Sequence, residues 1–256
     1  QRISEGSLHL SAARPAGVHR LSFLGCFFAV PAIATLKRCR RGQAKSYKKT
    51  MITILFSVGF LPFLILFGSL IISITVHEFA HGFAADKLGD PTPRIQGRLS
   101  LDPRAHLDPL GTIAMLLTWF GWGKPVMFDP YNLRDPRRDA AIIGLAGPAS
   151  NIILATVLAI IMRLIPQPLL VWVVFTSIIR LNIILAVFNL IPIHPLDGGK
   201  ILIGFLPKEI AYEWNAILSR YGMIILIFLI FPFAGTSPIS HLISPVIDAL
   251  LNLLIP

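Results

Sequence analysis

Long apolar runs, separated by short polar stretches, make up most of the chain. The first, Ile52–Val76, is expected to continue as a helix through His77–His81 to about Ala85. Ala140–Met162 and Leu169–Ile191 are two further runs of full length. At ~1.5 Å per residue, each run is long enough to cross a hydrocarbon core of ~30 Å. The pattern therefore predicts membrane-spanning helices.

The segments between the first two runs are polar or too short to span a bilayer. Asp86–Pro109 is predicted to be a polar loop, with Arg94–Leu101 as a short strand or hairpin arm. Leu110–Trp122 has only 13 residues, which is short for a crossing. The loops on either side of it are both rich in Lys and Arg, and such loops favour the cytoplasmic side. We therefore expect this segment to dip into the membrane and to return on the same side.

Prolines interrupt the apolar pattern after the third run. Pro192 and Pro195 are expected to end the helix, and a short helix should follow from about Gly198 to Phe205. An interfacial segment and two apolar segments come last: Lys208–Arg220, Met223–Phe233 and Ile239–Ile255. The sequence thus predicts an all-α polytopic membrane protein, a bundle of four to six transmembrane helices with a re-entrant or short segment and a small strand-like loop.

The composition supports the same class of protein. Of the 256 residues, 54% are hydrophobic and only 14% are charged, and the mean hydropathy is +0.71. A soluble domain of this length would need more polar surface. Residues 1–50 hold 10 of the 23 Lys and Arg residues but one acid, so the tail carries +9 of the net charge of +10. The body has no excess of basic residues to offer phosphates, which excludes a nucleic-acid partner.

The first fifty residues differ in character from the rest. Leu21–Leu36 is an apolar stretch of 16 residues, and a signal or transit segment is one interpretation. We favour the other, in which Met51 is the natural start and residues 1–50 are a non-native or cleaved basic tail. Residues 51–256 then form a single domain. Both cysteines, Cys26 and Cys39, lie in the tail, so the body has no thiol to serve as nucleophile or metal ligand.

One helix of the body carries the pattern His-Glu-x-x-His. His77 and His81 are four residues apart, so their imidazoles lie on one helix face and can reach one metal ion. Glu78 is rotated about 100° from His77 and is free to accept a proton from a water molecule. Two histidines at this spacing can be ordinary core residues. In a membrane helix, however, burying these three side chains costs several kcal/mol. A functional role therefore explains their presence better than ordinary core packing.

A catalytic zinc site usually has three protein ligands, so a third is expected. The candidates are His106, His194, His241 and the carboxylates of the body. Most of the carboxylates lie in polar loops, where a solvated charge needs no further explanation. Asp197 differs, because it follows a membrane span and lies among prolines and glycines that unwind the backbone.

His77–His81, together with Asn189-x-x-Pro-x-x-Pro-Leu-Asp-Gly198, resembles the site-2 protease family of intramembrane zinc metalloproteases, peptidase family M50. The two motifs occur in the order that this family shows, on separate hydrophobic segments. The chain looks like the compact bacterial branch without PDZ or CBS domains. The resemblance implies one Zn²⁺ per chain, held by His77, His81 and Asp197, with Glu78 as general base.

The resemblance also implies a location and partners. It implies an integral membrane protein of the bacterial cytoplasmic membrane, with an active site open to the cytoplasmic side, and membrane-embedded protein substrates. Asn189 matches the asparagine of the family motif, which helps to bind the substrate backbone or the developing oxyanion. His194 and Asn151 are further candidates for substrate binding or for contacts to the ligands, although close helix packing explains Asn151 equally well.

Three other functions stay open at this point. A membrane metal transporter would use His77, His81 and Asp197 as a transient site and would not need Glu78 as a base. An amidase that acts on small substrates in the lipid phase would use the same residues as a protease. A noncatalytic scaffold should lack a ligand or the base, and this chain has all four residues. The sequence leaves the oligomeric state undetermined.

Overall fold

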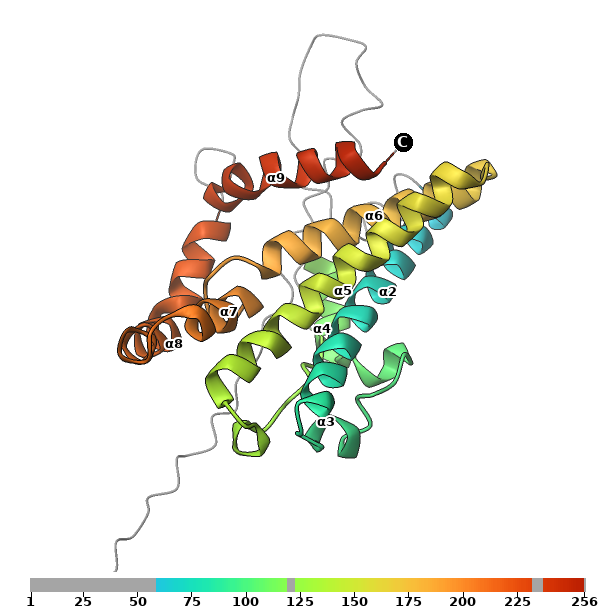
Figure 1. The fold of residues 1–256 in the computed structure, drawn as a ribbon. Helices are drawn as coiled ribbons and strands as arrows, with labels where there is room; N and C mark the ends of the chain where they lie inside the picture. Colours follow the sequence, from blue (N-terminus) through green and yellow to red (C-terminus); the bar gives the residue numbers. More distant parts are fainter. Residues whose placement is uncertain (1–58, 119–122, 232–236, 256) are drawn as a thin grey trace, which may run out of the picture.

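The computed structural model describes residues 59–118, 123–231 and 237–255, and the regular elements within these ranges are helices (Figure 1). Three long helices lie side by side: α2 (Phe60–Lys87), α5 (Pro136–Leu164) and α6 (Leu169–Asn189). Together with α8 (Lys208–Ile230), they are the four helices of the described chain that are long and apolar enough to cross a membrane. The predicted all-α polytopic membrane fold is confirmed, with the number of candidate spans at the lower end of the expected range.

Proline residues set the ends of the central hairpin. At the start of α5, the Asp135 side chain accepts a hydrogen bond from the Arg138 N–H at 3.2 Å, and Pro136 occupies the first turn, where no N–H is needed. Pro168 precedes α6 and fixes its start. Because only a short turn joins α5 to α6, the two helices pack as an antiparallel pair, and α2 packs against both.

The connection from α2 to α5 contains α3 (Thr92–Ile95), α4 (Pro109–Thr118) and two 3₁₀ turns, Pro103–Ala105 and Pro130–Asn132. The prediction of a strand over Arg94–Leu101 is wrong. Pro93 lies in the first turn of α3, a position that suits its fixed φ, and Gly97 turns the chain with φ +68° directly afterwards. A helical turn closed by a glycine therefore replaces the expected extended segment.

The residues just before and just after the short apolar segment lie next to each other. Leu107 and Gly123 form an isolated antiparallel β-bridge, and the Lys124 N–H donates to the His106 carbonyl at 2.8 Å. The ten residues of α4 cover about 15 Å at ~1.5 Å per residue, too little to cross a bilayer. This geometry is what a re-entrant or short segment requires.

The C-terminal part consists of α7 (Asp197–Phe205), α8 and α9 (Pro238–Leu254). The sequence predicted an interfacial piece over Lys208–Arg220 and a separate apolar one from Met223, but the structure has the single helix α8. A stripe of buried residues runs along one face of it and explains its continuity: Ala211, Leu218, Gly222, Leu226 and Ile230. An apolar core joins α5, α6, α8 and α9. The predicted basic tail, residues 1–50, lies outside the described residues.

Candidate metal centre

Helix α2 delivers three polar side chains to the interior of the bundle. His77, Glu78 and His81 are exposed by 0%, 2% and 5%, so water hardly reaches them from outside. The two imidazoles are one helical turn apart, with ring centroids 4.6 Å apart, and they lie nearly perpendicular to each other. Their Nε2 atoms approach to 3.0 Å. This confirms that the i, i+4 spacing brings both rings to one point.

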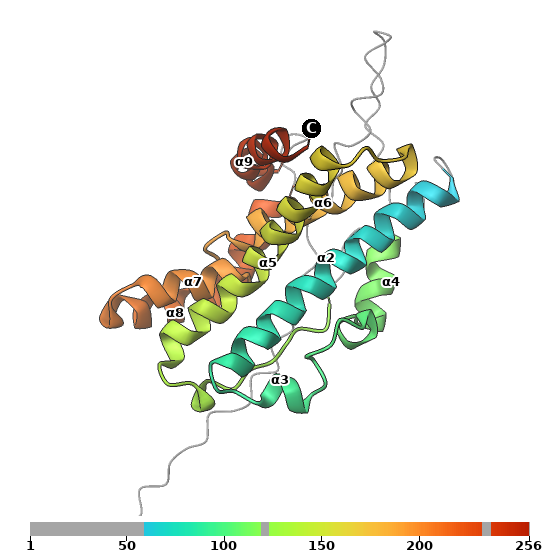
Figure 2. The same cartoon turned by 45° about the vertical axis from the view of Figure 1, so that its right-hand side comes forward.

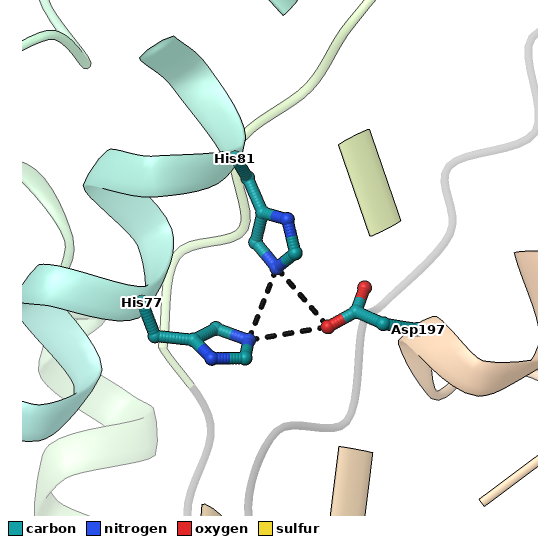
Figure 3. Close-up of side chains that lie close together, drawn as sticks. All are labelled: His77, His81 and Asp197. Carbon is teal, nitrogen blue, oxygen red and sulfur yellow. Dashed lines mark hydrogen bonds and ion pairs between the residues drawn. The ribbon is translucent and has the colours of Figure 1, made fainter. Parts of the chain in front are cut away.

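Asp197 reaches the same point, although it lies far from the two histidines in the sequence. Helix α6 ends at Asn189, a compact turn follows, and Asp197 is the first residue of α7 (Figure 3). The turn is tight at Gly198, where an added Cβ would lie 2.2 Å from the carbonyl oxygen of Ile191. Only glycine permits this approach, so the glycine after Asp197 brings the start of α7 back onto the end of α6.

The three side chains form a triangle of potential ligand atoms. Asp197 Oδ2 lies 3.1 Å from His77 Nε2 and 3.0 Å from His81 Nε2 (Figure 3). A tetrahedral ion with bonds of ~2.0–2.1 Å would hold its ligand atoms roughly 3.3–3.4 Å apart. Two imidazole nitrogens and one carboxylate oxygen are also a ligand set that zinc accepts. The residues present therefore fit a bound zinc ion.

Contacts from helix α5 fix how His81 presents its nitrogen atoms. His81 Nδ1 lies 2.6 Å from the Ile143 carbonyl oxygen, an acceptor, so Nδ1 carries the proton. Nε2 then offers a lone pair to a metal, which is the usual arrangement for a ligating histidine. One turn along α5, Gly147 leaves space for the ring: an added Cβ there would lie 2.4 Å from His81 Nε2.

The Glu78 carboxylate lies beside the triangle, not in it. Its Oε2 accepts a hydrogen bond from the Val126 N–H at 3.1 Å. Its Oε1 is buried and has no hydrogen-bond partner within the described residues. A buried carboxylate oxygen without a donor is costly unless water or a reactant supplies one. One oxygen of Glu78 thus has a hydrogen-bond donor, and the other has none within the described residues.

A small cavity of about 40 Å³ opens next to these groups. Its walls come from α2, α5, the end of α6 with the turn that follows it, the start of α7 and the segment that precedes α5. The lining residues are Glu78, His81, Pro125, Val126, Phe128, Ile143, Asn189, Pro195, Asp197 and Lys200. Because the cavity contains the carboxylate and two of the three possible ligands, a water molecule or a peptide group in it would lie against the reactive atoms.

The other predicted site residues have different surroundings. Asn189 lines the cavity, and its Nδ2 donates to the Leu185 carbonyl at 2.9 Å. His194 lies apart from the cavity lining, because its backbone and Cβ lie against Gly222 of α8. Asn151 is fully buried on α5, and its Nδ2 has no partner in the described chain. The structure therefore brings only Asn189 of these three to the cavity.

Two residues at the site escaped the sequence analysis. Val126 contributes a backbone N–H, which no side-chain pattern reveals. Lys200 contacts Asp197 Oδ1 with its Nζ at 2.9 Å. A signal for Lys200 was present in the sequence, since a cation one helical turn after a buried aspartate at a helix start suggests an ion pair. Their positions add a donor and a cation to the predicted set of ligands and base.

The comparisons with known proteins point to one family. The model of peptidase family M50 matches residues 165–229. “Putative zinc metalloprotease YwhC” of Bacillus subtilis is 34% identical over 203 residues, which cover 76% of this chain and 90% of that protein. “Putative zinc metalloprotease Rip2” of Mycobacterium tuberculosis is 32% identical over 155 residues, which cover 57% of this chain and 59% of that one.

Archaeal matches were found among the curated proteins and among the solved structures. “Zinc metalloprotease MJ0392” of Methanocaldococcus jannaschii is 29% identical over 182 residues, covering 70% of this chain and 46% of that one. Among solved structures, “Site-2 Protease from Methanocaldococcus jannaschii” has 25% sequence identity and a TM-score of 0.45, and the match covers 80% of each chain. The names of the relatives and the His-His-Asp cluster both indicate zinc as the cofactor. The resemblance seen in the two motifs is confirmed, and the chain belongs to peptidase family M50.

Proposed function

We propose that this protein is a zinc-dependent intramembrane endopeptidase that hydrolyses peptide bonds of membrane-embedded proteins. The observation that carries the proposal is a buried carboxylate, Glu78, next to a buried His-His-Asp cluster. Glu78 and the two histidines lie on the membrane-spanning helix α2, and the aspartate lies on α7. In this proposal His77 Nε2, His81 Nε2 and Asp197 Oδ2 hold the zinc ion, and Glu78 is the general base.

In the proposed mechanism, the contacts of Glu78 give each of its oxygens a different role. The Val126 N–H holds Oε2 in place, so Oε1 is the atom that removes a proton from the attacking water. Bound zinc supplies the Lewis acidity that makes the water acidic enough and polarises the scissile carbonyl. Glu78 then delivers the proton to the leaving amine. In this proposal Asn189, which lines the same cavity, donates to the substrate backbone or the oxyanion.

The position of the site supports access from the cytoplasm. His81 is six residues from Lys87, where α2 ends, which is about 9 Å along the helix axis at ~1.5 Å per residue. The loops at that end of α2 and α5 carry most of the basic residues of the body, and basic loops favour the cytoplasmic side. Water can thus reach the cavity over a short path from that side of a bacterial cytoplasmic membrane.

A metal transporter is the main alternative, and the anchored base argues against it. A transient metal site has no need for a buried carboxylate that is oriented by a backbone N–H but lies outside the ligand triangle. An amidase that acts on small lipid-phase substrates would use the same groups. The candidate substrates are therefore best compared directly, by offering the purified protein single-span peptides and small amides under the same conditions.

The test of the proposal is Glu78→Gln, which keeps the size of the side chain but removes its basicity. We expect zinc content to stay at about one ion per chain while cleavage of a membrane-embedded reporter falls by roughly 10²-fold or more. Glu209→Gln makes the same change on the exposed start of α8 and should cleave like the wild type. Cleavage at the wild-type rate by the Glu78 variant would refute the assigned base.

A further inference from the structure

The two oxygens of Asp197 have different partners. Oδ2 faces His77 and His81, whereas Oδ1 lies 2.9 Å from Lys200 Nζ. Asp197 and Lys200 are three residues apart on α7, so the ion pair closes over one helical turn. One oxygen of the Asp197 carboxylate thus faces the other potential metal ligands, and the second oxygen is paired with the ammonium group of Lys200.

The packing around Lys200 holds its side chain in this position. Its Cβ lies against α5, where a Cβ added to Gly144 would approach it to 3.3 Å. Its Nζ lies 5.9 Å from the centre of the Phe128 ring, on the wall of the cavity. The side chain is 32% exposed and makes an ion pair with a carboxylate that is only 6% exposed. A charge pair shielded in this way is stronger than one on an open surface.

The number of oxygens that a carboxylate gives to a metal depends on what else binds it. An aspartate can coordinate through one oxygen or through both, and a hydrogen bond to the outer oxygen favours the first mode. We propose that Lys200 is a positioning residue that keeps Asp197 monodentate, with Oδ2 as the ligand atom and Oδ1 retained by the ammonium group. This inference rests on the proposed metal site.

The consequence concerns the coordination position that the reaction needs. Three ligand atoms from the protein leave a fourth position for water or substrate. If Oδ1 also became a ligand, it would add a fifth ligand beside that position and hinder substrate from reaching it, and turnover would fall even with metal bound. Metal affinity alone does not reveal this role, because removing Lys200 also removes a positive charge near the ion, which by itself favours metal binding.

The coordination number gives a direct readout. We suggest preparing the full chain in detergent, replacing the metal with Co²⁺, and recording the visible absorption of the wild type, Lys200→Met and Lys200→Arg. Four-coordinate cobalt absorbs more strongly than five-coordinate cobalt. We expect the absorption per bound cobalt to fall at least about twofold in Lys200→Met and to recover in Lys200→Arg, which keeps the charge and the donors.

The controls separate this inference from the proposed function. Lys208→Met removes an exposed cation from the start of α8 and should leave the cobalt spectrum unchanged. If Lys200→Met does not fold, Lys200→Leu gives the same comparison with another side chain that has no donor. Spectra equal to the wild type in a variant without the ammonium group would overturn the role of Lys200 and leave the proposed metal site intact. A wild-type protein that binds no cobalt would overturn the metal site, and this inference with it.

Discussion

Gly147 shows how closely the backbone of α5 approaches the two imidazoles. An added Cβ at this position would lie 2.4 Å from His81 Nε2 and 2.7 Å from His77 Cε1. Both contacts are far shorter than van der Waals distance, and both rings are buried, so neither can swing aside into solvent. The absence of a side chain at this position is therefore a requirement of the ligand geometry and not only of helix packing.

We predict that Gly147→Ala weakens zinc binding by at least about tenfold, because the methyl group displaces one or both imidazoles. Binding is measured by competition with a chromogenic chelator. Gly68→Ala is the matched control, since no heavy atom lies within 4 Å of a Cβ added there, and alanine is the better helix former. The control should bind zinc like the wild type. Equal zinc affinity in both variants would contradict the close approach of α5 to the rings.

At the scale of the element, one buried carboxylate joins the two loops beside the site. Asp90, in the turn after α2, accepts hydrogen bonds from the Thr92 N–H and hydroxyl, from the Asp129 N–H at 2.7 Å and from Asn132 Nδ2 at 2.8 Å. Asp129 belongs to the segment whose Val126 N–H holds Glu78. Asp90 thus fixes a segment that reaches Glu78, the proposed base.

These contacts make stability depend on pH. Burial by itself raises the pKa of Asp90, but the hydrogen bonds from Thr92, Asn132 and Asp129 outweigh it, and the net pKa lies below its ordinary value. A carboxyl group with a lowered pKa in the folded state contributes stability above its unfolded pKa of ~3.9. That contribution is lost as the pH falls through the folded pKa.

We therefore predict that Asp90→Asn lowers the stability at neutral pH by about 1.5–3 kcal/mol, the value of a hydrogen bond to a charged group. Thermal unfolding of the protein in detergent, recorded from pH 7 to pH 3, measures this. The difference from the wild type should begin to shrink below about pH 4, where the unfolded chain takes up the proton, and should disappear as the pH falls through the lowered pKa of folded Asp90. Asp102→Asn, at an exposed cap where asparagine serves equally well, should unfold like the wild type throughout. A pH-independent difference for the Asp90 variant would contradict a role for its charge.

The helices could be predicted from sequence where the signals are local. α5, α6 and α7 follow apolar runs whose ends are marked by neighbouring prolines and glycines, and their predicted limits differ from the observed ones by only a few residues. α8 was divided in the prediction, because its first half is polar overall. The buried stripe that continues from Ala211 to Ile230 depends on which face meets its neighbours, and single-residue polarity does not show this.

The same distinction applies to the site. His77 and His81 could be paired from their spacing, and Asp197 from its unusual place after a membrane span. The Val126 N–H and the Ile143 carbonyl are backbone groups, and any residue type can supply them. They come to the site through tertiary packing of segments 48 and 62 residues away from their partners. The sequence could therefore predict that these three side chains meet, but not the backbone contacts that orient the site.

At the scale of the whole molecule, the two ends of the bundle differ in charge. The end of α2, the start of α5 and the segment that joins them carry a set of basic residues: Lys87, Arg94, Arg98, Arg104, Lys124, Arg134, Arg137 and Arg138. The turn between α5 and α6, at the opposite end of the bundle (Figure 2), has none, and the last turn of α5 before it contributes Arg163. Since the cytoplasmic side retains loops rich in Lys and Arg, the end with α3 should face the cytoplasm.

This orientation can be tested with single cysteines, because the only native ones are Cys26 and Cys39, which serine can replace. Tyr131→Cys lies at the basic end and Ile165→Cys at the opposite end, and both side chains are exposed, by 85% and 56%. A membrane-impermeant maleimide should label the Tyr131 variant in inverted vesicles and the Ile165 variant in right-side-out vesicles.

The reverse labelling would place the His81 end of α2 outside the cell. The short path from the cytoplasm to the Glu78 cavity would then be wrong, although the metal site itself would stand. Labelling of both variants from one side would instead show that α5 does not cross the bilayer, in conflict with its 29 residues of mostly apolar helix.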